Sequence, residues 1–165
     1  MAELDITLAS VLASRFDANV ARVRELGSSL SEKEFWARPY PYGNSFGHLV
    51  LHLTGNLNYY IGAQIANTGY VRDRNREFTE PSPPSKEEAL KRLGDAVAMV
   101  AETVHAQLPA DWSKSYSGVN TNCSNRLDMV LQCAAHMQHH LGQMIYLCHE
   151  WQRQHEATKL EGSVT

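Results

Sequence analysis

Apolar residues return every three or four positions along most of this chain, a spacing that predicts amphipathic helices. Four stretches follow this spacing, and they cover residues 3–30, 45–67, 85–108 and 125–155. No segment alternates between apolar and polar residues as a half-buried strand would, and no internal repeat is present. The sequence therefore predicts an all-α fold, and four long helices favour a four-helix bundle.

Capping residues mark where these helices begin. Ser31 and Ser85 are each followed three residues later by a glutamate, the capping-box pattern that opens a helix. The first box predicts a short helical turn that Pro39 and Pro41 end. The second long helix is expected to start after Asn44 and Ser45, and the fourth near Asn125, since these residue types cap helix N-termini well.

The connection between residues 67 and 85 is unusually long and rich in proline, arginine and serine. Loops of this length are uncommon and often functional, and in bundles they cross from one end to the other. We therefore expect the second and third long helices to be parallel and joined by a long crossover. Arg72, Arg74 and Arg76 on this loop could contact an anionic ligand, but a solvated charged loop is the favoured interpretation.

Composition and charge narrow the classes of protein. A chain of 165 residues that is 43% apolar is expected to form one domain, residues 1–165. A formal net charge of −3 without a basic block argues against nucleic-acid binding. No apolar run approaches the roughly 18 residues of a membrane span, and the N-terminus does not resemble a signal peptide. We expect a soluble cytoplasmic protein whose three cysteines, Cys123, Cys133 and Cys148, are reduced.

Histidines are concentrated in two of the predicted helices. Five of the eight lie in the segments 48–52 and 136–140, and each segment contains two histidines four residues apart. Residues at this spacing lie on one face of a helix, one turn apart. A helical wheel places His52, His136 and His140 at the edge of the apolar arcs, whereas His48 and His139 lie farther out.

Three imidazoles from two packed helices could hold one divalent metal ion. Three protein ligands leave a position for water or substrate, as catalytic sites do. The alternative is that these are core-edge histidines with ordinary hydrogen bonds, since pairs at this spacing also arise by chance. The segment is not an H-E-x-x-H protease motif, because Met137 stands where the general base would be. A di-iron carboxylate site is also disfavoured, since neither of the two histidine-rich helix faces offers a glutamate at the required Glu-x-x-His spacing.

The segment 136–143, His-Met-Gln-His-His-Leu-Gly-Gln, is similar to the H-x-x-H-H-x-G-Q motif on the last bundle helix of the DinB-like superfamily. That superfamily includes bacillithiol- and mycothiol-dependent transferases. The run from Gly43 through His52 resembles the family's second helix, where a histidine before a leucine supplies a metal ligand. The resemblance extends over nearly the full chain and includes the long crossover.

The resemblance implies His52, His136 and His140 as the metal ligands, with His48 as a rival to His52. Gln143 and His139 match motif positions without being ligands, and Gly142 suggests a close helix approach. The metal would be Zn²⁺, or Ni²⁺, Fe²⁺ or Mn²⁺ in its place. Family members are commonly metal-dependent and often dimeric, so a homodimer is expected.

Two functions remain open from the sequence. One is a metal-dependent enzyme, a thiol S-transferase or a small-molecule hydrolase, whose substrate could be a low-molecular-weight thiol. In that enzyme Asn56, Tyr59 and Tyr60 could orient the substrate. The other is a non-catalytic bundle that binds or senses a metal, or that is purely structural.

Overall fold

The computed structural model describes residues 2–116, 118 and 122–162, so the outermost residues of the predicted domain lie outside the described part. Its helices are α1 (Ala2–Ser28), α2 (Glu32–Trp36), α3 (Phe46–Leu57), the π-helix η1 (Asn58–Ala63), α4 (Arg76–Thr79), α5 (Lys86–His105) and α6 (Arg126–Gly162). The described residues contain one isolated β-bridge, between Ser115 and Asn125, and no strand. The all-α prediction is confirmed.

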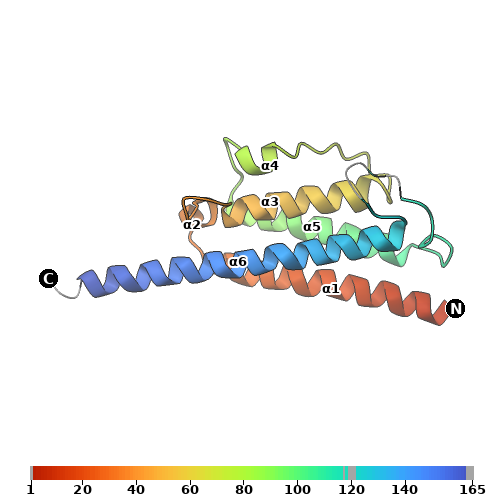
Figure 1. The fold of residues 1–165 in the computed structure, drawn as a ribbon, viewed down its shortest axis with the longest axis horizontal. Coiled ribbons are helices and arrows are strands. Elements are labelled where there is room, and N and C mark those ends of the chain that lie inside the picture. The colour runs from red at the N-terminus through yellow and green to blue at the C-terminus, as the bar shows by residue number, and fades with distance from the viewer. Residues whose placement is uncertain (1, 117, 119–121, 163–165) are drawn as a thin grey trace.

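The four long helices form a bundle in which each packs against two others. Helix α1 contacts α5 and α6, and α3 contacts the same two helices, so α1 and α3 occupy opposite corners. Figure 1 shows that α1 and α6 run in one direction while α3 and α5 run in the other. The segment from η1 to α5 crosses from one end of the bundle to the other, over the outside of α3. The parallel pair and the crossover are as predicted.

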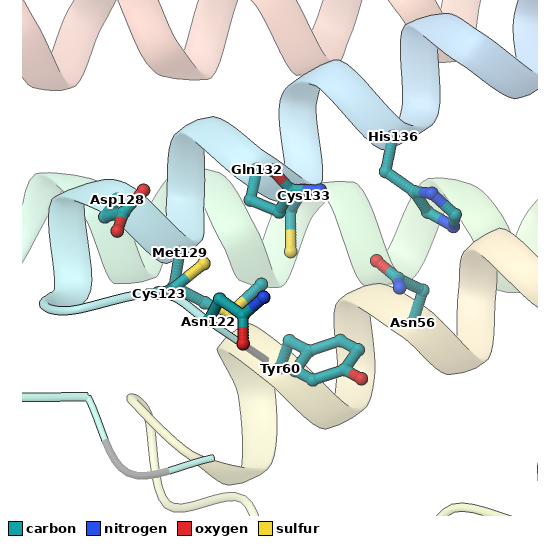
Figure 2. A pocket seen from close by; sticks show the side chains of 9 residues that line it. All are labelled: Asn56, Tyr60, Asn122, Cys123, Asp128, Met129, Gln132, Cys133 and His136. Atoms are coloured by element: carbon teal, nitrogen blue, oxygen red, sulfur yellow. The ribbon is translucent and has the colours of Figure 1, made fainter. Parts of the chain in front are cut away.

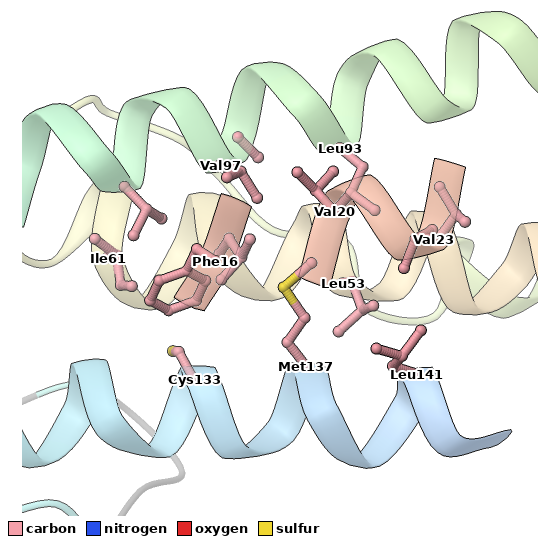
Figure 3. Close-up of a cluster of buried hydrophobic side chains, with 14 of the residues drawn as sticks. Phe16, Val20, Val23, Leu53, Ile61, Leu93, Val97, Cys133, Met137 and Leu141 are labelled. Carbon is pink, nitrogen blue, oxygen red and sulfur yellow. The ribbon is translucent and has the colours of Figure 1, made fainter. Parts of the chain in front are cut away.

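The core is built from the apolar stripes of all four helices, as Figure 3 shows. Phe16 and Val23 of α1 meet Leu53 of α3, Val97 of α5 and Met137 of α6, and all five are fully buried or nearly so. Complete burial of one such side chain stabilises the fold by roughly 1.5–3 kcal/mol. This packing fixes the separation and rotation of α3 and α6, and therefore of the histidines on them.

The helices begin where the capping residues predict. Ser31 forms a complete capping box with Glu34, and the Ser85 hydroxyl accepts a hydrogen bond from the backbone N–H of Glu88. The Ser45 hydroxyl caps α3 in the same way, through the N–H of His48 at 3.1 Å.

The ends of three helices differ from the prediction. The α-helical part of the second helix ends at Leu57, and the chain continues as the π-helix η1. Within η1, the backbone carbonyl of Tyr60 accepts a hydrogen bond from the Tyr116 hydroxyl at 2.9 Å. Helix α5 ends at His105, which leaves Leu108 exposed in the following turn. Helix α6 continues to Gly162, since residues 143–161 contain no proline or glycine that would end it earlier.

Two of the three cysteines lie in the core. Cys133 and Cys148 are buried, and the three described cysteines form no disulfide with one another. Burial raises the pKa of Cys133 to about 12 and that of Cys148 to about 11, so both thiols stay protonated.

Within the described ranges, no helix has the length and apolar character needed to cross a membrane.

Candidate metal centre

His52 on α3 and His136 and His140 on α6 converge at the interface of the two helices. Each offers one nitrogen atom, and these atoms all lie within 4.8 Å of one another. The Nε2 atoms of His52 and His136 are 2.9 Å apart, and the rings of His136 and His140 have centroids 4.4 Å apart. The packing of α3 against α6 brings these histidines together across 84 residues of sequence.

The other two histidines of the motifs lie outside this cluster. The Nδ1 atom of His48 is 2.7 Å from the hydroxyl of Ser45, and its ring lies against Trp36. His139 is exposed, and its Nε2 atom is 3.1 Å from the side-chain amide of Gln143. Of the two candidates on α3, His52 is therefore the one that the structure places beside His136 and His140.

A buried carboxylate that the sequence did not reveal holds His52. The Nδ1–H of His52 donates to Glu77 Oε2 at 2.8 Å, and both side chains are 6% exposed. Glu77 belongs to α4, inside the crossover. A Cβ atom at Gly55 would overlap its carboxylate, so the glycine makes room for it. A metal-binding histidine usually donates a hydrogen bond from its second ring N–H to such a group. Here this leaves the Nε2 lone pair of His52 available.

Arg72 completes the chain of contacts behind His52. Its Nε and Nη2 atoms donate to the two oxygens of Glu77 at 2.6 and 2.9 Å. Burial by itself would raise the pKa of Glu77, but the hydrogen bonds from His52 and Arg72 outweigh it, so this pKa lies below its usual value. The solvated-loop interpretation is wrong for Arg72, whose side chain is only 9% exposed. It is correct for Arg74 and Arg76, which are exposed.

His140 provides the clearest test of whether a metal ion fits. Its Nδ1–H donates to Gln143 Oε1 at 2.8 Å. Its Nε2 atom is buried and has no hydrogen-bond partner among the residues that the structure describes. Unpartnered buried polar atoms are rare in proteins and call for a physical explanation. A metal ion shared with His52 and His136 would satisfy this nitrogen, so the donor set fits a metal.

The protonation of the cluster also suits a metal. Burial and the neighbouring His140 and His52 lower the pKa of His136 to about 4. Burial likewise lowers the pKa of His140. Both rings are therefore neutral at physiological pH, and a histidine must be neutral to coordinate a metal ion.

A cavity of about 440 Å³ opens beside His136, between α3, α6 and the segment before α6 (Figure 2). Asn56 and Tyr60, two of the three residues expected to orient a substrate, line it, whereas Tyr59 is not among its described lining residues. The full lining consists of Asn56, Tyr60, Asn122, Cys123, Asp128, Met129, Gln132, Cys133 and His136.

The prediction that another helix approaches closely at Gly142 is wrong. A Cβ atom at this position would meet nothing within 4 Å among the described atoms. Gly142 lines a surface groove together with Tyr40 and Tyr146. The motif match at this position therefore has no packing basis.

The fold and the site together define an all-α bundle protein with a histidine cluster between its second and last long helices. In a comparison with protein families, residues 15–144 match the DinB superfamily, and the chain belongs to that superfamily. The matched region contains all three clustered histidines and Glu77. A search of curated proteins finds no match.

Proposed function

We propose that this protein is an enzyme that uses a divalent metal ion held by His52, His136 and His140. Zn²⁺ is the ion proposed, and Ni²⁺, Fe²⁺ or Mn²⁺ would also suit three imidazoles. The observation that carries the proposal is the buried, unpartnered Nε2 atom of His140, which lies with the other two histidines in a cluster that could bind a metal. Among the residues that the structure describes, this nitrogen has no hydrogen-bond partner.

A bound ion of this kind lowers the pKa of a thiol or a water molecule, which supplies a nucleophile near neutral pH. The chain's own residues prepare the site for it. Glu77 accepts the Nδ1 proton of His52, and Gln143 accepts that of His140, so both rings present Nε2 to the cluster. The cavity beside His136 would hold the second reactant. The reaction class proposed is thiol transfer or the hydrolysis of a small molecule.

Metal analysis of protein purified without a histidine tag tests the site. We expect one equivalent of metal in the wild type and almost none in the double variant His136→Ala, His140→Ala. His139→Ala is the matched control because this exposed histidine adjoins His140 on α6, and it should keep its metal. Unchanged metal content in the double variant would show that the ligand assignment is wrong.

Catalysis needs a separate test, since a metal-binding or sensing bundle would also pass the metal analysis. The metal-loaded protein is incubated with low-molecular-weight thiols and a set of electrophiles, with the double variant in parallel. Conjugation or hydrolysis that requires both metal and His136 and His140 supports the enzyme. No turnover across the whole set would favour the non-catalytic alternative.

A further inference from the structure

Asn56 gives the cavity beside His136 a buried hydrogen-bond acceptor that nothing in the described structure satisfies. The residue is 7% exposed, and its Oδ1 atom has no partner among the described residues. Figure 2 shows its side chain in the space between α3 and α6, pointing toward His136. A buried amide oxygen without a donor destabilises the folded protein, and native structures rarely keep one without a reason.

The other polar lining residues of the cavity differ from Asn56 in this respect. The carboxylate of Asp128 is already engaged, since its Oδ2 accepts hydrogen bonds from the backbone N–H of Ser124 at 2.8 Å and from its hydroxyl at 3.3 Å. Asn122 and Gln132 are exposed, so water can reach their amides. The missing partner of Asn56 is a hydrogen-bond donor, and the cavity is the place from which it would come.

Asn56 is also placed to contact a molecule that reaches the histidine cluster. It follows His52 by four residues on α3, so it shares a face of the helix with that histidine and lies about 6 Å farther along the axis. His136 belongs to the cluster and lines the same cavity as Asn56. A molecule in the cavity can therefore contact the cluster with one atom and Asn56 with a group a few bonds away.

We propose that Asn56 determines substrate specificity, because its side-chain oxygen accepts a hydrogen bond from a hydroxyl or N–H group of the substrate. The inference rests on the proposed function for the metal centre and adds a feature of the molecule that reacts there, a donor a few bonds from the reacting atom. An amide oxygen is uncharged, so it selects for the donor and not for the net charge of the substrate.

The stability of Asn56→Leu distinguishes this role from a structural one. Leucine has a similar shape and removes the oxygen. If Oδ1 serves only a ligand, the metal-free protein loses no interaction, and its free energy of unfolding should stay constant or rise. Chemical denaturation of the metal-free wild type and variant measures this. A fall in stability, or a variant that does not fold, would show that the oxygen holds the structure together and would overturn the inference.

Imidazole and 1-methylimidazole test the donor directly. Each can coordinate zinc through one ring nitrogen, but only imidazole keeps an N–H on the other, and 4-methylimidazole, which has both a methyl group and an N–H, controls for size. NMR titration of the ¹⁵N-labelled, zinc-loaded protein should give a Kd at least about fivefold lower for imidazole than for 1-methylimidazole, with 4-methylimidazole close to imidazole. The difference should disappear in Asn56→Leu, and the zinc content of each variant is measured.

Asn58→Leu is the matched control. Asn58 follows two residues later but lines a different cavity with Thr54 and Tyr70, so the preference for imidazole should remain. Equal binding of imidazole and 1-methylimidazole to the wild type would overturn the inference and leave the proposed metal site standing. A preference for imidazole that survives in Asn56→Leu would overturn it as well. If the protein binds no zinc, the proposed function fails, and the stability comparison, which needs no metal, decides the role of Asn56.

Two thiols extend the comparison to the proposed substrate class. 2-Mercaptoethanol carries a hydroxyl donor where 1-propanethiol carries a methyl group. The two also differ in acidity and polarity, so the ratio of their Kd values is compared between the wild type and Asn56→Leu. The variant should lose at least about threefold in its relative affinity for 2-mercaptoethanol, and an unchanged ratio would overturn the inference. If neither thiol binds, thiol transfer fails as the reaction, and the imidazole comparison still decides the role of Asn56.

Discussion

The carboxylate of Glu77 determines which nitrogen of His52 is available to a metal. Its Oε2 accepts the Nδ1–H of the ring, so Nε2 carries the lone pair and points to His136. Arg72 keeps this carboxylate ionised and in place from the other side. The three buried side chains, His52, Glu77 and Arg72, thus act as one unit. Loss of the Glu77 charge would leave the Arg72 charge uncompensated, and the reverse also holds.

Glu77→Gln should lower metal affinity by roughly 10–100-fold, the usual effect of removing the group behind a histidine ligand. The glutamine keeps the shape but cannot balance Arg72, so the fold should also lose roughly 3 kcal/mol. Competition with a chelating dye measures the affinity, and chemical denaturation measures the stability. Glu80→Gln, which breaks an ion pair with the exposed Arg76, should change neither. Equal metal affinity in the two variants would contradict the assigned role of Glu77.

The pKa of His136 predicts how the metal-free protein responds to acid. Burial and the nearby His140 and His52 lower this pKa from 6.5 to about 4. The unfolded chain therefore binds this proton more readily than the folded protein does. The contribution of neutral His136 to the free energy of unfolding is complete above about pH 6.5 and is lost as the pH falls toward 4. Denaturation of the metal-free protein across this range should show the decline, and His136→Asn should flatten it. An equally steep decline in His136→Asn would show that other groups are responsible.

At the scale of elements, the crossover supplies what the helices alone lack. Helix α4 packs on α3 and places Glu77 behind His52. Periodicity predicted the long helices, and the wheel separated His52, His136 and His140 from His48 and His139. Neither method could identify Glu77 or Arg72 as part of the site. Both residues lie in the crossover, where the sequence has no periodic spacing from which a contact with α3 could be predicted. The π-helix η1 and the open space at Gly142 could not be predicted either, because both depend on tertiary contacts and not on the local sequence.

Gly55→Ala should displace Glu77 and weaken metal binding. The new Cβ atom would overlap the carboxylate, which His52 and Arg72 hold from the other side, so the contact cannot relax freely. Gly142→Ala is the matched control, since its Cβ would enter open space and alanine favours a helix by about 1 kcal/mol over glycine. Metal affinity should fall at least about tenfold in Gly55→Ala and stay constant in Gly142→Ala. Unchanged metal affinity in Gly55→Ala would contradict this prediction, because it would show that displacement of Glu77 does not weaken the site.

Across the whole molecule, the bundle brings distant parts of the chain to one site. The crossover makes α3 and α5 parallel, which places α3 beside the antiparallel α6 and covers α3 with α4 (Figure 1). The three histidines therefore bridge two helices, α3 and α6, and a third segment, α4 in the crossover, supports His52. A ligand that binds all three histidines contacts groups that are together only in the folded state, so its binding energy adds to the stability of the entire fold.

Metal should consequently raise the melting temperature of the whole bundle in one transition. At a free concentration about 1,000 times its Kd, a ligand that binds only the folded state adds about 4 kcal/mol. For a domain of this size that corresponds to an increase in Tm of roughly 10 °C. Calorimetry with and without Zn²⁺ measures the shift, which should persist in His139→Ala and vanish in His136→Ala, His140→Ala. The same increase in all three proteins would place the stabilising ion elsewhere and contradict a site that joins α3 to α6.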